Sequence, residues 1–305
     1  MKIKKIKSIK RIKQEATVYN FHVPKYESYV ANGFVTHNCY VARHNTFGNP
    51  LVMYSNTNEI LDAVVDHYYT LPPKYPTYSN QQDEWSWVYD VGECTDMMSS
   101  RMIELTNIIV RQLLIRTDLK PSFATKLSSK HAVSLLEEIP KTRKARIRVS
   151  LMPQRIADIV EVGTVPIAER IKSIKDIYDK GYECHINFAP IILYNGWIQD
   201  YIELFQMVDE EISSYGNYYY NKLKNILKCE VIMLTHHPKL HESNLKWNPE
   251  AEEIMWAPQY QEFKTNKRGA TDILRYKIEF KKQATNFFAQ LIAKHLPYCT
   301  IRYIF

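Results

Sequence analysis

The sequence predicts an α/β fold with a parallel sheet or a barrel at its centre. From residue 56 onward, segments with helical spacing of apolar residues alternate with short apolar strand candidates. In the segment 99–117, Met102, Leu105, Ile109 and Leu113 recur on one side of a helix. Repeated β-α units of this kind indicate a parallel sheet, because each helix carries the chain back to the start of the next strand.

The individual elements follow in chain order. Short apolar runs predict strands at 85–91, 122–125, 145–151, 185–190, 231–234, 271–278 and 300–305. Amphipathic spacing predicts helices at 56–71, 99–117, 130–136, 167–180, 198–212 and 281–295. Asn56 or Thr57 is a suitable cap for the first helix, and the last helix ends before Leu296 and Pro297.

Composition limits the classes of protein that the chain can belong to. It has 305 residues, of which 45% are hydrophobic, enough for one large domain and an appendage. No apolar run approaches the length of a membrane span, and no signal peptide is visible. Five cysteines, at 39, 94, 184, 229 and 299, do not form a disulfide framework in a chain this long. We therefore expect a protein of the reducing cytoplasm with no membrane partner.

The positive charge belongs to the first 38 residues. That segment holds eight of the 40 basic and two of the 33 acidic residues, whereas 39–305 is almost balanced. Attraction to an acidic partner fragment explains this charge better than DNA binding by the body. Isoleucines repeat every three residues from Ile3 to Ile12, which fits a solvated basic helix, a targeting peptide or a strand, and the strand is the interpretation we prefer.

The stretch from Val18 to Cys39 carries a recognisable pattern. Two short strand candidates flank the tight-turn pair Asn32-Gly33, and His37, Asn38 and Cys39 follow. A cysteine thiolate can accept an acyl chain, an asparagine can cyclise and cleave its own peptide bond, and a histidine can protonate the departing amine. An ordinary loop would explain the tripeptide alone, but not the whole pattern.

This stretch resembles the C-terminal end of an intein, a segment that excises itself and joins its flanks. The resemblance implies that His37, Asn38 and Cys39 are the splicing residues. Asn20 and Glu27 stand where the family usually has Asp and His. Only 38 residues precede Cys39 and the chain begins with Met1, so we expect the C-terminal half of a split intein, with an inactive remnant as the alternative.

Several separated stretches of the body carry a second resemblance. Cys39 to Arg43 looks like the end of a Cys-x₃-Cys-x₂-Cys-Tyr cluster motif, and further matches follow in order at 92–96, 123–128, 148–153, 163–170, 187–192, 194–197, 267–269 and 275–276. Over 39–305 the chain resembles the spore photoproduct lyase family of radical S-adenosylmethionine (SAM) enzymes. The resemblance implies a partial (β/α) TIM-type barrel with a C-terminal β-hairpin and helix, lacking its N-terminal part.

The same resemblance implies cofactors and roles. Cys39 would be one ligand of a [4Fe–4S] cluster, which binds SAM and cleaves it to a 5′-deoxyadenosyl radical. That radical would take a hydrogen from a thymine dimer in DNA, and Cys94 would return one to the product. Lys126, Ser150 and Glu93 are the candidate SAM-binding residues, and Tyr40 is an aromatic beside the cluster.

No cysteine precedes Cys39, so the other two cluster cysteines are expected on an N-terminal partner that splicing joins to Cys39. Two classes of function remain: a precursor that becomes a DNA photoproduct lyase, or a splicing chain whose body is inactive or only binds. A related enzyme acting on another substrate is also open, because Ala189 stands where the family has Asp.

For several other residues we expect a structural role or no specific role. Cys184, Cys229 and Cys299 are expected to be inert buried thiols, and Lys126 could be an ordinary lysine at a strand end. His236, His237 and His241 have near-metal spacing, but no fourth ligand is evident, so we expect a solvated loop there.

Overall fold

The structure is a computed structural model, and it describes most of the chain beyond residue 55. The described residues are 30–31, 34–35, 56–75, 83–92, 96–100, 102–130, 132–140, 145–224, 226–236, 238–265 and 272–304.

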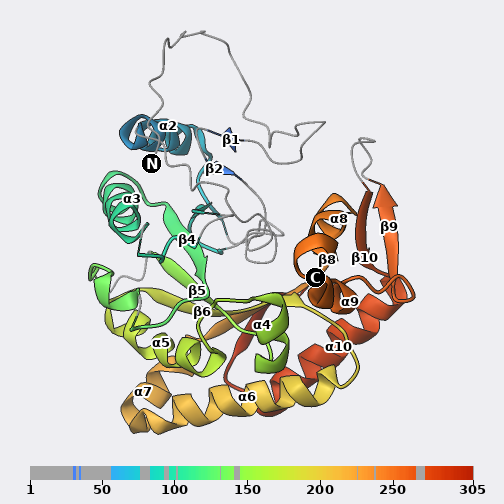
Figure 1. The fold of residues 1–305 in the computed structure, drawn as a ribbon. Helices are drawn as coiled ribbons and strands as arrows, with labels where there is room; N and C mark the ends of the chain where they lie inside the picture. Colours follow the sequence, from blue (N-terminus) through green and yellow to red (C-terminus); the bar gives the residue numbers. More distant parts are fainter. Residues whose placement is uncertain are drawn as a thin grey trace.

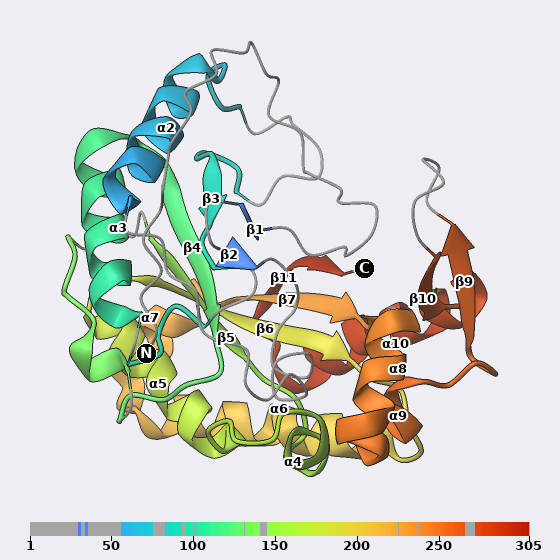
Figure 2. The same ribbon diagram turned by 45° about the horizontal axis from the view of Figure 1, so that its top comes forward.

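A curled, six-stranded parallel sheet forms the centre of the molecule (Figures 1 and 2). Its strands stand in the order β3 (Val88–Asp90), β4 (Lys120–Thr125), β5 (Arg146–Ser150), β6 (Glu183–Ile191), β7 (Lys228–Met233) and β11 (Thr300–Ile304). Each strand pairs in parallel with its neighbours. The half-barrel confirms the α/β fold that the alternating elements predicted.

The central strands β5 and β6 alternate between apolar and polar residues over most of their length. In β5, Ile147 and Val149 alternate with Arg146, Arg148 and Ser150, and β6 repeats the pattern. Strands of a parallel sheet with both faces covered are usually apolar throughout. Here the apolar face packs on helices. The polar side chains of the opposite face are also buried, and they can form a site.

The helices that follow the strands cover the outer face of the sheet (Figure 1). The helix α3 (Ile103–Arg116) packs on β4, and α5 (Ile167–Asp179) packs on β5 and β6. The long helices α6 (Trp197–Ser214) and α10 (Ile278–His295) pack on each other. The remaining helices on this part of the chain are α2 (Thr57–Thr70), η1 (Val133–Leu135), α4 (Gln154–Val160) and α7 (Gly216–Leu223).

A smaller unit lies at one end of the half-barrel (Figure 1). It contains a three-stranded antiparallel sheet in the order β8 (Thr235–His236), β10 (Asp272–Tyr276) and β9 (Gln261–Thr265). Two helices, α8 (Pro238–Trp247) and α9 (Pro249–Met255), separate β8 from β9. Both helices begin at a proline, which suits a first helical position because no amide hydrogen is required there.

Near the N-terminus, β1 (Val30–Ala31) and β2 (Phe34–Val35) pair antiparallel, with Ala31 opposite Phe34. Asn32 and Gly33 are the two residues between the strands, so the predicted hairpin is confirmed. This short hairpin does not show an intein fold.

Three local expectations were wrong in detail. Of the predicted helix at 130–136, the described residues 130 and 132–136 form only the short 3₁₀ turn η1. The predicted strand at 271–278 ends at Tyr276, and α10 begins at Ile278 rather than at 281. All three errors arise because the spacing of apolar residues along the chain does not show where an element stops packing on the sheet. Cys184, Cys229 and Cys299 are buried free thiols, as predicted. Among the described helices, none is long and apolar enough to cross a bilayer.

Candidate functional site at the carboxyl ends of the strands

Polar side chains gather where β4, β5 and β6 approach their carboxyl ends. Lys126 follows β4, Ser150 ends β5, and Asn187 lies opposite Ser150 on β6. The side-chain amide of Asn187 donates to Ser150 Oγ at 3.4 Å. Its Oδ1 is buried and has no hydrogen-bond partner within the described part of the chain. An unsatisfied acceptor beside a hydroxyl, at the edge where α/β folds bind ligands, indicates a site for a polar ligand.

Glu161 fixes the position of the Lys126 ammonium. Lys126 Nζ lies 2.7 Å from Glu161 Oε1, and Arg170 Nη1 lies 2.8 Å from Glu161 Oε2. Burial of this carboxyl opposes ionisation, but Lys126 and Arg170 outweigh it and hold the pKa of Glu161 below its ordinary value. The charged pair places one cation at the end of β4, with 15% of the Lys126 side chain exposed.

Arg170 connects this pair to the end of β5. Its guanidinium donates to the main-chain oxygens of Ser150, at 3.0 Å, and Val165, at 2.8 Å. It also donates to the Thr164 hydroxyl at 2.6 Å, and the whole residue is buried. Lys126, Glu161 and Arg170 together form what we call the Lys126 network, in which Arg170 holds the end of β5 and Glu161 holds the Lys126 ammonium.

Asp96 attaches the loop after β3 to the end of β4. Its carboxylate accepts hydrogen bonds from the main-chain N–H of Lys126 at 2.8 Å and of Met98 at 2.9 Å. The Thr125 hydroxyl lies 3.0 Å from it. Burial raises the pKa of Asp96, although these donors oppose that shift. Asp96 stands two positions after Cys94 in the sequence.

Below these strand ends, charged side chains fill the polar face of the sheet. Lys120 Nζ lies 2.6 Å from both Asp83 and Glu183, and the Arg146 guanidinium lies 2.7 Å from Asp83 and 3.0 Å from Glu183. His185 Nε2 lies 2.5 Å from Glu183. Burial opposes ionisation of Glu183, but these partners hold its pKa well below the ordinary range.

A third carboxylate, Glu230, completes what we call the inner ion network. It pairs with Arg302, accepts the Tyr303 hydroxyl at 2.6 Å and lies 3.6 Å from Arg148. Arg148 in turn pairs with Asp90 at 2.6 Å. Burial is outweighed by these partners and by His185, which lower the pKa of Glu230 to about 2. The inner ion network is a layer of buried charged side chains below the candidate site.

The structure brings two of the predicted site residues together. Lys126 and Ser150 are linked through Arg170 and Glu161. The other predicted site residues lie outside the described residues: His37, Asn38, Cys39, Tyr40, Glu93 and Cys94.

Sequence reasoning missed several residues of the site. Asp96, Arg170 and Asn187 lie inside stretches that carried the family resemblance, but nothing local distinguished them from their neighbours. Glu161 carried no signal at all, because its role depends on Lys126, which is distant in the sequence.

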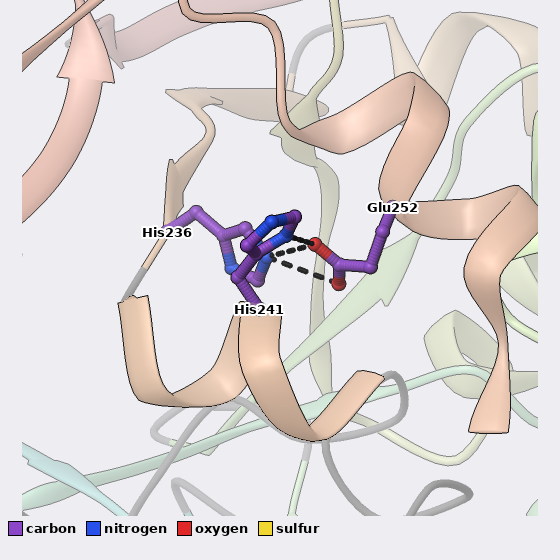
Figure 3. Close-up of side chains that lie close together, drawn as sticks. All are labelled: His236, His241 and Glu252. Carbon is purple, nitrogen blue, oxygen red and sulfur yellow. Dashed lines mark hydrogen bonds and ion pairs between the residues drawn. The ribbon is translucent and has the colours of Figure 1, made fainter. Parts of the chain in front are cut away.

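The expectation of a solvated loop around His236 and His241 was wrong. His236 is 4% exposed and lies on β8, while His241 lies on α8, and both ring systems contact the buried Glu252 of α9 (Figure 3). The third donor was missed because it lies in a different helix. His237 lies outside the described residues.

Comparison with known proteins assigns a family to this fold. The family model described as spore photoproduct lyase matches residues 19–305, a match that begins inside the segment 1–38 and does not show an intein there. The spore photoproduct lyase of Bacillus subtilis (strain 168) is 27% identical over 184 residues. That alignment covers 59% of this chain and 49% of the relative, so the match spans about half of the relative's length.

Solved structures support the same fold. A spore photoproduct lyase double mutant with bound AdoMet and dinucleoside spore photoproduct superposes with a TM-score of 0.72 at 17% identity, covering 88% of this chain and 73% of that one. A cysteine-to-serine mutant of spore photoproduct lyase gives a TM-score of 0.73 at 18% identity, covering 95% of this chain and 81% of that one.

Proposed function

The chain belongs to the spore photoproduct lyase family, and from this membership we propose that its body is a radical SAM lyase that repairs thymine-dimer (spore photoproduct) damage in DNA. The observation that carries the proposal is the polar constellation at the carboxyl ends of β4, β5 and β6, built around Lys126, Ser150 and Asn187. The body corresponds to residues 39–305, after a leader of 38 residues.

The residues at these strand ends fit SAM. Lys126 presents an ammonium whose orientation is fixed by Glu161, which suits the SAM carboxylate. The unsatisfied Asn187 Oδ1 and the adjacent Ser150 hydroxyl suit the amino and hydroxyl groups of the same molecule. We assign Lys126 and Ser150 to SAM binding, together with Glu93.

A [4Fe–4S] cluster with SAM would supply hydrogen-abstracting radical chemistry to this site. Cys39 would hold one iron, with two further cysteines from an N-terminal partner and Tyr40 beside them. Cys94 would then donate its thiol hydrogen to the repaired thymine, because an S–H bond is weak. Asp96, two residues later, ties its loop to Lys126 and so supports this role.

The leader is proposed to join the two parts of the enzyme. His37 would protonate the leaving amine, Asn38 would cyclise, and Cys39 would take the acyl chain before it serves the cluster. The order of these three residues and the β1–β2 hairpin before them support this proposal. Splicing would complete the cysteine motif.

Lys126 offers the sharpest test of SAM binding. Lys126→Met should weaken SAM binding by roughly 10- to 100-fold, the loss of one charge-assisted hydrogen bond. The matched control is Lys130→Met, since Lys130 is 75% exposed and pairs only with Glu169 among the described residues. Both would be measured by SAM titration of the anaerobically reconstituted, joined protein. If Lys126→Met and Lys130→Met bound SAM with equal affinity, Lys126 would not be a SAM-binding residue.

Substrate and the role of Cys94 can be tested in one assay. The joined, reconstituted protein is incubated with SAM, a strong reductant and dinucleoside spore photoproduct, and the products are followed by mass spectrometry. Cys94→Ala should keep SAM cleavage and lower the yield of repaired dinucleotide. SAM cleavage without any repair by the unaltered protein would favour another lesion, in keeping with Ala189. A full cluster without SAM cleavage would contradict the enzyme proposal.

Splicing is tested by intact mass after co-expression with a fragment that carries a Cys-x₃-Cys sequence and an intein start. A larger product lacking residues 1–38 is expected, and Asn38→Ala should block its release. An unchanged mass, with both fragments soluble and associated, would identify the leader as an inactive remnant.

A further inference from the structure

Two histidines and one glutamate, none of them among the residues assigned to SAM, converge in the smaller unit. His236 comes from β8, His241 from α8 and Glu252 from α9 (Figure 3). His236 Nε2 lies 2.8 Å from Glu252 Oε2 and 3.1 Å from Oε1, and His241 Nδ1 lies 2.6 Å from Oε2. One donor atom from each residue lies within 4.8 Å of the other two.

The environment of Glu252 calls for a cation. The residue is fully buried, and within the described part of the chain its ion-pair partners are the two imidazoles alone. A buried carboxylate is costly unless a positive charge matches it. A divalent metal ion can accept lone pairs from two neutral imidazoles and from the carboxylate at once.

Neighbouring groups hold the three donors in place. The Asn244 amide donates to Glu252 Oε1, and the Trp256 ring stacks on His241 with ring centroids 3.8 Å apart and planes 10° apart. On β8, His236 is opposite Leu274 of β10. Outer contacts of this kind orient metal ligands and are a regular part of metal sites.

The donor set selects the ion. Two imidazole nitrogens and one carboxylate are typical ligands of Zn²⁺, whereas Mg²⁺ and Ca²⁺ prefer oxygen alone. Zinc bonds of about 2.0–2.1 Å in a tetrahedron separate neighbouring donor atoms by about 3.3 Å. Glu252 Oε2 lies closer than that to both histidine nitrogens, at 2.8 and 2.6 Å, so the carboxylate would have to move back by about half an ångström to admit the ion.

We propose that His236, His241 and Glu252 bind one Zn²⁺, which fastens α8 and α9 to β8. None of these three ligands is a sulfur atom. Its position gives it a structural role, because Asn248, the N-cap residue of α9, donates its side-chain amide to the Ile159 carbonyl of α4 at 2.9 Å. Two residues after Ile159 stands Glu161, the partner of Lys126. The ion therefore stiffens α4, the helix that leads into Glu161 of the Lys126 network.

The test is a zinc titration of the full chain, stripped with a chelator and kept anaerobic, against a competing chromophoric chelator. One Zn²⁺ per chain is expected, with an X-ray absorption shell of nitrogen and oxygen at about 2.0–2.1 Å and the scattering pattern of imidazole. Glu252→Gln and His241→Ala should each weaken binding by at least roughly tenfold. Zinc should raise the Tm of the unaltered chain and leave that of both variants unchanged.

Matched controls are Glu250→Gln, an exposed carboxylate on the same helix, and His67→Ala, an exposed histidine on α2. Both should bind zinc as the unaltered chain does. A sulfur shell at about 2.3 Å would place the ion on cysteines instead and overturn the proposal. Equal affinity in Glu252→Gln and Glu250→Gln, or no binding by the unaltered chain, would leave a His–Glu–His hydrogen-bond cluster without a metal. None of these readouts depends on SAM chemistry.

Discussion

Replacing Arg170 with methionine is expected to lower the free energy of unfolding by about 3–5 kcal/mol. Methionine fills a similar volume, but it leaves Glu161 buried with one cationic partner instead of two. It also leaves the main-chain oxygens of Ser150 and Val165 without the guanidinium donor. Removing one member of a buried, hydrogen-bonded charge network is far more costly than removing an exposed one.

Urea unfolding at neutral pH measures this effect. The matched control is Arg111→Met, because Arg111 pairs with Glu137 while half of its side chain is exposed. Exposed pairs contribute about 0–1 kcal/mol, so the control should change stability by less than about 1 kcal/mol. Equal losses in Arg170→Met and Arg111→Met would show that the Lys126 network does not stabilise the half-barrel.

Acid should unfold this protein through the inner ion network. Glu230 has a pKa of about 2 in the folded chain, against an ordinary value of 4.5. Because the folded-state pKa is the lower one, folding favours the carboxylate and unfolding favours its protonation. The resulting stabilisation, about 3 kcal/mol, is complete above about pH 5 and is lost as the pH falls toward 2. Glu183 shifts in the same direction.

Glu230→Gln should therefore have two effects in urea unfolding at pH 7, 5, 4 and 3. At pH 7 it should lower the free energy of unfolding by about 3–5 kcal/mol, because the glutamine amide cannot neutralise Arg302 and Arg148. Between about pH 5 and 3 it should flatten the loss of stability, because one titrating group is gone. The control is the exposed Glu104→Gln. A variant with the slope of the unaltered chain would contradict the assignment.

Local patterns of the sequence determined most of the secondary structure. The helices α3, α5 and α6 and the strands β5 and β6 lie within a few residues of their predicted positions. Amphipathic spacing is a property of neighbouring residues, so it can be read without knowing what each element packs against.

Only the tertiary structure decided which charges meet. Lys126 and Glu161 come from different elements, and so do His236, His241 and Glu252. A lysine at a strand end and a glutamate at the end of a short helix look ordinary in the sequence, because nothing local says that burial will join them. The order of motifs along the chain therefore predicted the family and the half-barrel. The Lys126 network and the inner ion network exist only because the six-stranded sheet curls and brings distant residues together, and the histidine cluster exists only because α8 and α9 pack beside β8.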